Sequence, residues 1–562
     1  MTIDITVQPP ASPTTQAAPP ATLLDAAQRY RLKLDPALGA GNFLHVAAAI
    51  ARDNETPLVW SDVPYHLMGT EHDAPLSLAT LKREADTLAA WYAAQGVCAR
   101  DPVAVYGSNG IHYLLHYVAL TGLGAIPVLT NGNMRPEVAL RHFRRVGAVA
   151  VTADPAQHAA LLALDIGDGE FRFVARTDEI RAGTGDALPA GYPFRHDHLD
   201  PVMITHSSGT TGVPKPVLLQ HGKWFHGIRH LLGLAPAQGA ERYLSSLPVS
   251  HNAAIAYAMH AILCGAALMI VSRAEGGAVI DSIERFEPST VVSFPSTYVE
   301  MVAQGLDGRR LESVNNWINS GDAAHETHIR ELVRHGHHYR GKQKVQGSQF
   351  IDGLGSSEMG HSSFRALYTA GDQNFDRCVG RPQEWVDARV LADDGSELPV
   401  GQVGKLGIKS PSVTSGYWND SVLTYRSQLA GYWLTGDLVY RDAMGCFYHV
   451  DRISDAIRTA DGTLYSLQTE ELILKNEAAL LDCTVLGQPR ADGTALPVAF
   501  VFPRAGATPD CAAMLERINA EQARRQRPRL AEIRVVDPAD IPVGVTGKVM
   551  KQALRDRLGQ AA

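Results

Sequence analysis

Cysteine is scarce in this chain, and the cysteines present are far apart. Six of them are spread over 562 residues, and none forms a Cys-x-x-Cys pair. That distribution argues against a disulfide framework and against a structural zinc site, and it is typical of a protein in a reducing compartment. We therefore expect a cytoplasmic protein.

Long apolar runs and an excess of positive charge are also missing. No run reaches the roughly 18 apolar residues of a membrane-spanning helix. The most apolar stretch, residues 253–271, is interrupted by His260 and Gly265, which predicts a buried helix followed by a strand. The start of the chain lacks the basic and then apolar pattern of a secretory signal. The formal net charge of −8 makes nucleic acid an unfavourable partner.

The length predicts more than one domain. Residues 1–21 are rich in proline, alanine and threonine and are expected to be a disordered tail. Residues 22–452 are predicted to form a large N-terminal domain, and residues 453–562 a small α+β domain after a hinge. Near its end, a loop rich in glycine and threonine leads into a basic helix predicted over residues 549–558.

The early part of the chain alternates helices and short apolar strands. Helices are predicted over residues 78–95 and 111–123, and strands over 103–106, 125–129 and 149–152. Such alternation is typical of an α/β fold with a largely parallel sheet.

A loop of small and hydroxylated residues is the strongest functional signal. The run SSGTTGVPK occupies residues 207–215, directly after an apolar strand-like segment. Glycines let the backbone approach phosphate oxygens, hydroxyl and N–H groups donate hydrogen bonds, and Lys215 supplies a positive charge. The loop is not a Walker A motif, because Pro214 stands where that motif has glycine.

This loop resembles the phosphate-binding signature of the adenylate-forming superfamily, which includes acyl- and aryl-CoA synthetases, peptide-synthetase adenylation domains and luciferases. Further motifs in the same order extend the resemblance over residues 76–558: LPVSHN at 247–252, NSGDA at 319–323, GLGSSE at 353–358 and WLTGD at 433–437. The resemblance implies a large α/β domain with parallel and mixed sheets, followed by a small mobile domain that carries a catalytic lysine.

The resemblance also implies individual roles. Glu358 becomes the Mg²⁺ ligand, because a hard cation prefers carboxylate oxygen. Lys548 corresponds to the family's mobile lysine, which stabilises charge between the acid oxygen and the α-phosphate. The implied catalytic residues are Lys548, Thr210, Glu358 and His251. The implied nucleotide-binding residues are Ser207, Ser208, Gly209, Thr211, Gly212, Lys215, Ser320, Gly321, Asp322, Gly353, Leu354, Gly355, Ser356, Ser357, Asp437 and Arg452, with Ser454 as the hinge residue.

The implied activity is that of an acyl-CoA synthetase. A carboxylate attacks the α-phosphorus of ATP with Mg²⁺, pyrophosphate leaves, and coenzyme A then takes the acyl group from the adenylate. The acid is expected to bind beside Asn252, Ala253, Ala254, Met359, Gly360 and His361. Many of these residues are small, which favours a bulky or long acid. The resemblance also allows a homodimer.

Four departures from the family pattern bear on that activity. Leu354 stands where an aromatic residue usually stacks on adenine, and Pro216 where glycine usually follows the loop lysine. Arg458 replaces a frequent lysine, and the segment 459–466, which lines the thiol tunnel in the family, has one residue more than usual.

Several alternatives therefore stay open. The enzyme could perform only one half-reaction, adenylation or thioester formation from a supplied adenylate. It could load a carrier protein in trans, or be an inactive acyl-nucleotide binding protein. A histidine-based metal enzyme is the least supported, although the chain has 22 histidines. His226 and His230 would share a helix face, but no HExxH motif accompanies them, and the group His335, His337 and His338 is expected to be solvated.

Overall fold

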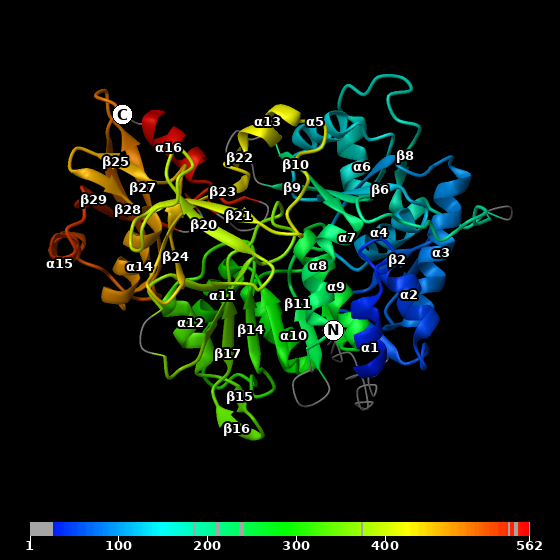
Figure 1. Cartoon of the computed structure of the whole chain (residues 1–562), viewed down its shortest axis with the longest axis horizontal. Helices are drawn as coiled ribbons and strands as arrows, with labels where there is room; N and C mark the ends of the chain where they lie inside the picture. Colours follow the sequence, from blue (N-terminus) through cyan, green and yellow to red (C-terminus); the bar gives the residue numbers. More distant parts are fainter. Residues whose placement is uncertain are drawn as a thin grey trace, which may run out of the picture.

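A computed structural model describes residues 26–183, 187–207, 214–234, 241–372, 375–537, 540–544 and 549–560. The predicted tail, residues 208–213 of the phosphate loop and Lys548 fall outside these ranges. The C-terminal elements β27, β28 and α15 lie at one end of the molecule, and α2 and α3 lie at the other (Figure 1).

One large sheet of 14 strands forms the middle of the molecule. Its hydrogen-bonded order is β20-β21-β23-β24-β19-β18-β17-β14-β13-β11-β12-β1-β4, with β22 paired to β23. The strands are β1 (Pro57–Ser61), β4 (Leu76–Ser77), β11 (Arg242–Ser245), β12 (Ala267–Ile270), β13 (Thr290–Ser293), β14 (Asn316–Asn319), β17 (Gln349–Asp352), β18 (Phe364–Tyr368), β19 (Cys378–Pro382), β20 (Asp387–Leu391), β21 (Gly404–Lys409), β22 (Gln428–Leu429), β23 (Tyr432–Arg441) and β24 (Phe447–Arg452).

Strands β1, β12, β11, β13, β14 and β17 run parallel, and those from β18 to β24 are antiparallel. Parallel strands end at a common edge, where α/β proteins place their ligands. The segments that follow β11, β13, β14 and β17 begin at residues 246, 294, 320 and 353. Three of the predicted site motifs therefore meet at one edge of the sheet.

A second, four-stranded parallel sheet confirms the alternation expected early in the chain. Its order is β6-β5-β7-β8. The strands are β5 (Pro102–Gly107), β6 (Ile126–Asn131), β7 (Ala150–Ala153) and β8 (Val174–Arg176), and the helices around them are α3 (Leu78–Ala94), α4 (His112–Gly122), α5 (Pro136–Val146) and α6 (Pro155–Leu162). Every residue of β5, β6 and β7 is buried, as a sheet covered on both faces requires.

The remaining helices and short strands surround these sheets. The helices are α1 (Ala26–Leu34), α2 (Phe43–Ile50), α7 (His221–Trp224), α8 (His226–Leu231), α9 (Asn252–Cys264), α10 (Gly276–Phe286), α11 (Pro295–Gln304), α12 (Glu326–Val333) and α13 (Ser421–Arg426), with a 3-10 turn η1 (Thr177–Glu179). The strands are β2 (Tyr65–Leu67), β3 (Thr70–His72), β9 (Pro201–Ser207), β10 (Lys215–Gln220), β15 (His337–Arg340) and β16 (Gln343–Gln346). No helix among the described residues is long and apolar enough to cross a membrane.

The small C-terminal part has its own sheet, β27-β28-β29. Its elements are β25 (Ile457–Thr459), β26 (Gly462–Leu464), α14 (Ser466–Asn476), β27 (Leu480–Pro489), β28 (Ala495–Pro503), α15 (Cys511–Arg524), β29 (Glu532–Val535) and α16 (Lys551–Gln560). The basic helix begins two residues later than predicted, because Val549 forms a β-bridge with Val543. The segment expected to carry an extra residue forms the tight β25–β26 hairpin.

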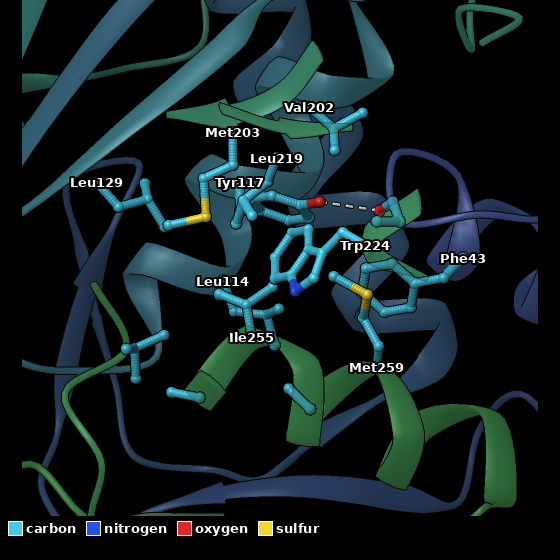
Figure 2. Packing of buried hydrophobic residues seen from close by; sticks show 14 of the residues in the cluster. Phe43, Leu114, Tyr117, Leu129, Val202, Met203, Leu219, Trp224, Ile255 and Met259 are labelled. Carbon is cyan, nitrogen blue, oxygen red and sulfur yellow. Dashed lines mark hydrogen bonds between the residues drawn. The ribbon is translucent and has the colours of Figure 1, made fainter. Parts of the chain in front are cut away.

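The apolar core fixes α9 in place, as Figure 2 shows. Met259 on α9 is fully buried in the same cluster as Phe43 on α2 and Trp224 on α7. Tyr117 on α4 meets the Trp224 ring edge-on at 6.0 Å and donates a hydrogen bond to the carbonyl of Ala40 at 3.0 Å. Burying each large side chain contributes about 1.5–3 kcal/mol. Helix α9 is thus a rigid support for the residues at its start.

Candidate active site

Tyr417 interacts with both Glu358 and Lys215. The Tyr417 hydroxyl donates to Glu358 Oε1 at 2.9 Å, and Lys215 Nζ lies 5.9 Å from the centroid of the Tyr417 ring. The turn that carries Tyr417 is joined to β10, because Trp418 N donates to the Pro216 carbonyl at 2.7 Å. Burial raises the pKa of Tyr417, and the Glu358 carboxylate raises it further, so the hydroxyl stays a donor.

Asp437 is a buried carboxylate held between two basic groups. It is 3% exposed, and its Oδ1 lies 3.2 Å from Arg452 Nε and 3.3 Å from His449 Nε2. Burial alone would raise the pKa of Asp437, but Arg452 and His449 outweigh it and lower that pKa well below its usual range. The Arg452 pKa is raised by Asp437 first, and then by Asp322 and Glu358. Three acidic residues predicted for the site, Asp437, Asp322 and Glu358, thus act on the guanidinium of a fourth, Arg452.

The loops after β14 and β17 are joined through Asn319. Its amide donates to the Asp322 carbonyl and to Asp352 Oδ1, each at 2.9 Å. Gly321 has a positive φ of 82°, and a Cβ there would lie 2.5 Å from Cε1 of Phe294. At Gly353 a Cβ would lie 2.3 Å from the Phe364 carbonyl oxygen. The predicted need for small residues in these loops therefore has a steric cause.

The other predicted residues of these loops lie close by. Ser320 N donates to the Ser293 carbonyl at 3.2 Å, and the Ser356 carbonyl accepts from Met359 N at 3.1 Å. A Cβ on Gly355 would lie 3.1 Å from the Cα of Ser362. Leu354 is partly buried and packs against the main core. Leu354, which stands where the family usually has an aromatic residue, therefore contacts apolar side chains and is not fully exposed to solvent.

His251 precedes the first residue of α9 and caps the helix. Its Nδ1 accepts from Ala253 N at 3.2 Å, and its ring meets Phe294 edge-on at 5.6 Å. Burial, reinforced by His206, lowers the His251 pKa to about 4, so the imidazole is neutral at pH 7. A backbone N–H can only donate, so Nδ1 is the acceptor and the proton of the neutral ring is on Nε2. His251 therefore offers a hydrogen-bond donor, not a base, through Nε2.

The expected pocket residues split into two groups. Ser357 Oγ donates to Asn252 Oδ1 at 3.1 Å, next to Ala253 and to Ala254, which is 5% exposed. Met359 is 0% exposed and belongs to the core. Gly360 has a φ of 71° and lies against the Ser412 carbonyl, so the chain turns there and places His361 against α8. The residues predicted to line the pocket thus lie at the start of α9 and, beyond Gly360, beside α8.

Six predicted residues lie outside the described ranges: Ser208, Gly209, Thr210, Thr211, Gly212 and Lys548. Their flanks are placed, because Ser207 ends β9 and Lys215 begins β10, antiparallel to it. The expected hinge residue Ser454 lies between β24 and β25. Its carbonyl accepts from Arg555 Nη2 at 3.5 Å, and Arg555 also pairs with Asp455 at 2.9 Å. Helix α16 therefore contacts the segment that was predicted to be the hinge.

Two residues of the site were not anticipated as functional. Neither Tyr417 nor His449 was predicted to have a role, since neither belongs to a motif that by itself indicates chemistry. The expectation that His335, His337 and His338 are solvated was wrong for His338, which is 4% exposed. It lies on β15, where alternate residues face inward, and its Nδ1 bonds the Gly347 carbonyl.

The model of the AMP-binding enzyme family matches residues 54–418. This chain belongs to the AMP-binding enzyme family. The family assignment confirms the resemblance inferred from the sequence motifs, and the α/β architecture with its smaller C-terminal part confirms the predicted fold class.

Relatives in this family include more than one kind of enzyme. The chain is 40% identical to a 3-aminoavenalumate diazotase of Streptomyces sp, covering 95% of this chain and 98% of that protein. It is 27% identical to a 3-amino-2-hydroxy-4-methoxybenzoate diazotase of Streptomyces cremeus (92% and 94% covered) and 26% identical to a feruloyl-CoA synthase of Amycolatopsis sp (86% and 94%).

Among solved structures, an anthranilate CoA ligase in complex with anthranoyl-AMP superposes with a TM-score of 0.77 at 18% identity, covering 96% of this chain and 99% of that one. At that identity, the likeness establishes the fold alone.

Proposed function

We propose that this chain is a diazotase, which uses ATP to activate nitrite and transfers the nitrogen to an aromatic amine that bears a carboxylate. The observation that carries the proposal is the 40% identity to a diazotase over nearly the whole of both chains. The departures in the segments that line the family's thiol tunnel agree with it, because diazotisation needs adenylation but no thiol. The sequence left open an enzyme that performs adenylation only; a diazotase shares that type of first step but activates nitrite in place of a carboxylic acid.

The chemistry uses the family's first step with a different acid. A nitrite oxygen attacks the α-phosphorus of ATP, and pyrophosphate leaves, so that a mixed anhydride of nitrous acid and AMP remains. The amine nitrogen attacks the nitroso nitrogen, the N–O bond to phosphate breaks, and AMP leaves. In the resulting N-nitrosoamine the remaining N–H proton moves to the nitroso oxygen, which gives a diazohydroxide. Its hydroxyl takes up one proton, the equivalent of the proton that the amine released to the AMP phosphate, and leaves as water, so that the diazonium ion remains. One nitrite oxygen ends in AMP and the other in water.

Asp437 suits the ribose of ATP. Because Arg452 and His449 keep it ionised, both of its oxygens are acceptors at neutral pH for the ribose hydroxyls. Arg452 adds a donor at the junction of the two parts of the chain. Lys215 lies at the start of β10, directly after the phosphate loop, where its charge would offset that of the phosphates. Lys548 keeps its predicted role on the transferred group.

His251 suits the activated nitrite. A neutral imidazole with its proton on Nε2 can donate to a nitroso or phosphate oxygen as negative charge develops there, without repelling the amine by a charge of its own. The proton released by the amine would pass to the departing AMP phosphate. This division of roles needs no base on the protein at this position.

Glu358 would hold Mg²⁺, and the ion would neutralise part of the negative charge on the phosphates of ATP. One carboxylate together with substrate phosphates and water is a donor set that Mg²⁺ accepts. The Tyr417 hydroxyl fixes Oε1 of this carboxylate by a hydrogen bond of 2.9 Å. The donor chemistry therefore fits the ion.

An aryl-CoA synthetase is the second candidate, favoured by the 26% identity to a feruloyl-CoA synthase over 489 residues. In that case the aromatic carboxylate is adenylated, coenzyme A is the acceptor, and nitrite has no part. The two candidates differ in what they require for release of AMP.

The deciding experiment supplies the full chain with ATP, Mg²⁺ and 3-aminocinnamate, and adds nitrite or coenzyme A separately. We expect AMP and pyrophosphate to appear only with nitrite, and a diazonium product that couples with 2-naphthol to an azo dye. With ¹⁸O-labelled nitrite, one label is expected in AMP. Release of AMP without nitrite, with formation of a thioester, would show that the second candidate is right.

Glu358→Gln provides the control for the site. It should lower nitrite-dependent AMP formation by about 100-fold or more, because the charge that holds the metal is lost. The matched variant Glu532→Gln removes a partly exposed carboxylate paired with Arg534 on β29, and should leave the rate unchanged.

A further inference from the structure

A group of basic side chains lies beyond the predicted pocket, on α1, α8 and α9 and in the loop after Gly360. We call it the basic cluster. Its members are Arg29, His226, His230, His260 and His361. The rings of His226, His230 and His361 pack with Trp385, and His260 interacts electrostatically with His361 and Arg29. None of them was assigned a catalytic part above, and only His361 was expected to line the pocket.

Three of the histidines surround the ring of Trp385. The ring centroids of His226, His230 and His361 lie 5.8, 4.5 and 6.3 Å from that of Trp385. His361 fits there because α8 has no side chain at Gly227, where a Cβ would lie 2.4 Å from the His361 Cγ. The indole nitrogen of Trp385 is buried and has no hydrogen-bond partner. The rings are in close contact, yet the indole N–H of Trp385 still lacks a hydrogen-bond acceptor.

His260 connects these rings to the far end of α9. Its Nε2 lies 3.5 Å from Cys264 Sγ, and its ring meets Tyr243 edge-on at 6.0 Å. Burial lowers the His260 pKa to about 4, and His361 and Arg29 add to that shift, so His260 has basic neighbours on two sides. Burial raises the pKa of the Cys264 thiol, and the nearby carboxylate of Glu241 raises it further. The same carboxylate accepts a hydrogen bond from the Tyr243 hydroxyl at 3.4 Å.

Arg29 brings a permanent positive charge to this region. It is 5% exposed, and its Nη1 is buried without a hydrogen-bond partner. Helix α1 is held in place by Arg229 of α8, whose guanidinium donates to the carbonyls of Leu32 and Lys33 at 3.4 and 3.3 Å. An unpaired guanidinium in the interior is costly unless a ligand completes its pairing.

The cluster also lies at a defined distance from the reaction centre. His251 precedes α9 and His260 lies near its other end, nine residues on, which corresponds to about 13 Å along a helix. An aromatic amine whose nitrogen reaches the activated nitrite near His251 would extend its opposite end toward the cluster. In a substrate that has both groups on an elongated aryl skeleton, that opposite end is the carboxylate.

We propose that the basic cluster is the receptor for the carboxylate of the amine substrate, with Arg29 as its charge partner and the histidines as hydrogen-bond donors. The proposal rests on the proposed function, because only a substrate that reacts through its amine directs the carboxylate away from the nucleotide. It predicts selectivity for elongated, anionic aryl amines.

The test measures equilibrium binding to the full chain in the presence of AMP and without nitrite. The probes are 5-(3-aminophenyl)penta-2,4-dienoate, whose amine and carboxylate lie farther apart than those of 3-aminocinnamate, and its uncharged primary amide, compared by calorimetry. We expect the carboxylate to bind more tightly than the amide, and Arg29→Met to reduce this preference by at least about 30-fold. Arg29→Lys, which keeps the charge, should retain part of it. Arg31→Met, an exposed arginine on the same helix, is the matched control and should keep all of it.

A purely structural Arg29, placed to offset the carbonyls at the end of α9, predicts a different result. Arg29→Met would then weaken both probes equally or lower only the thermal stability, and the preference would remain. That outcome, or a wild-type protein that does not distinguish carboxylate from amide, overturns the proposal. Binding is measured without turnover, so a protein that shows the Arg29-dependent preference but forms no diazonium would refute the proposed function separately.

Discussion

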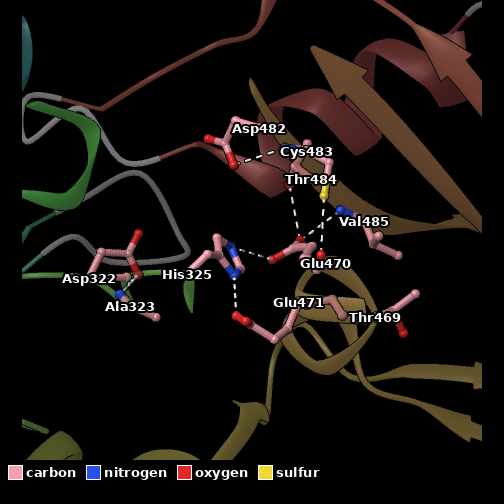
Figure 3. Close-up of polar contacts among 12 residues, drawn as sticks. Asp322, Ala323, His325, Thr469, Glu470, Glu471, Asp482, Cys483, Thr484 and Val485 are labelled. Atoms are coloured by element: carbon pink, nitrogen blue, oxygen red, sulfur yellow. Dashed lines mark hydrogen bonds and ion pairs between the residues drawn. The ribbon is translucent and has the colours of Figure 1, made fainter. Parts of the chain in front are cut away.

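Two buried groups of ionisable side chains can be compared in this molecule, the basic cluster and a second group where α12 meets α14 and β27. The second, which we call the junction cluster, comprises His325, Arg377, Glu470, Glu471 and Lys551, and Figure 3 shows its centre. His325 Nδ1 lies 2.9 Å from Glu471 Oε2, and Arg377 Nη1 lies 3.9 Å from the same oxygen. Lys551 Nζ pairs with Glu470 Oε1 at 2.8 Å.

The difference between the two clusters is charge balance. In the junction cluster each buried acid faces a base, and Glu471 also accepts from Glu326 N at 3.1 Å. In the basic cluster, Arg29 Nη1 has no hydrogen-bond partner. Burial lowers the His361 pKa, and two more histidines, His226 and His230, lower it further. A cluster whose charges are all paired within the protein stabilises the fold, whereas a cluster with an unpaired charge can bind a ligand of the opposite charge.

The largest expected effect is in the junction cluster. Glu471→Ala should lower the free energy of unfolding by about 3–5 kcal/mol, because His325 and Arg377 would keep their buried positions without an acid. Urea denaturation measures this. The control Glu532→Ala, which breaks a partly exposed pair with Arg534, should cost less than about 1 kcal/mol. Equal losses of unfolding free energy for the two variants would mean that burial does not determine how much an ion pair contributes to stability.

A smaller loss is expected when the packing of the basic cluster is changed. Gly227→Ala should destabilise by about 1–3 kcal/mol, since its Cβ would lie 2.4 Å from His361 Cγ and the ring must move. Gly277→Ala is the control, because a Cβ there has nothing within 4 Å. The double variant Gly227→Ala/His361→Ala should recover part of the loss, and simple additivity of the two losses would argue against this contact.

Removal of the unpaired charge should have the opposite sign. Arg29→Met is expected to leave the free energy of unfolding unchanged or to raise it by up to about 1 kcal/mol, because an unsatisfied buried cation is replaced by an apolar side chain of similar length. The measurement is urea denaturation without ligand. A loss as large as that of Glu471→Ala would show that Arg29 has a partner in the folded chain.

The most subtle difference is in pH dependence. Burial alone would lower the His325 pKa, but Glu471 raises it above 6.5, and burial of Glu471 is likewise outweighed by His325, which lowers the Glu471 pKa below 4.5. The histidine's contribution is complete below pH 6.5 and is lost as pH rises through its raised pKa. The carboxylate's is complete above pH 4.5 and is lost as pH falls through its lowered pKa. Stability from this pair is therefore greatest between about pH 4.5 and 6.5.

This dependence is measured by comparing wild type with His325→Gln in urea at pH 5.5 and pH 8.5. The stability difference between the two proteins should be larger at pH 5.5. A difference that is the same at both values would mean that His325 does not ionise in the folded state.

Much of the fold could be predicted from the local sequence. Strands β5, β6 and β7 and helices α3 and α4 were predicted to within a few residues, because apolar runs and flanking glycines report local burial. Three site motifs could also be recognised from the sequence, those at 247–252, 319–323 and 353–358. Glycine and small residues are required where loops meet, as at Gly321 and Gly353. The start of α16 was missed by two residues, since a bridge between Val543 and Val549 is not local.

The sequence by itself determined the family, the α/β architecture and the order of the nucleotide motifs, since each depends on neighbours along the chain. Only the tertiary structure decided the surroundings of those motifs. It placed Tyr417 beside Glu358 and Lys215, and His449 beside Asp437. It also left Arg29 buried without a hydrogen-bond partner for Nη1. Pairing and desolvation depend on residues hundreds of positions apart, and the charge balance of a buried site exists only once the chain has folded around it.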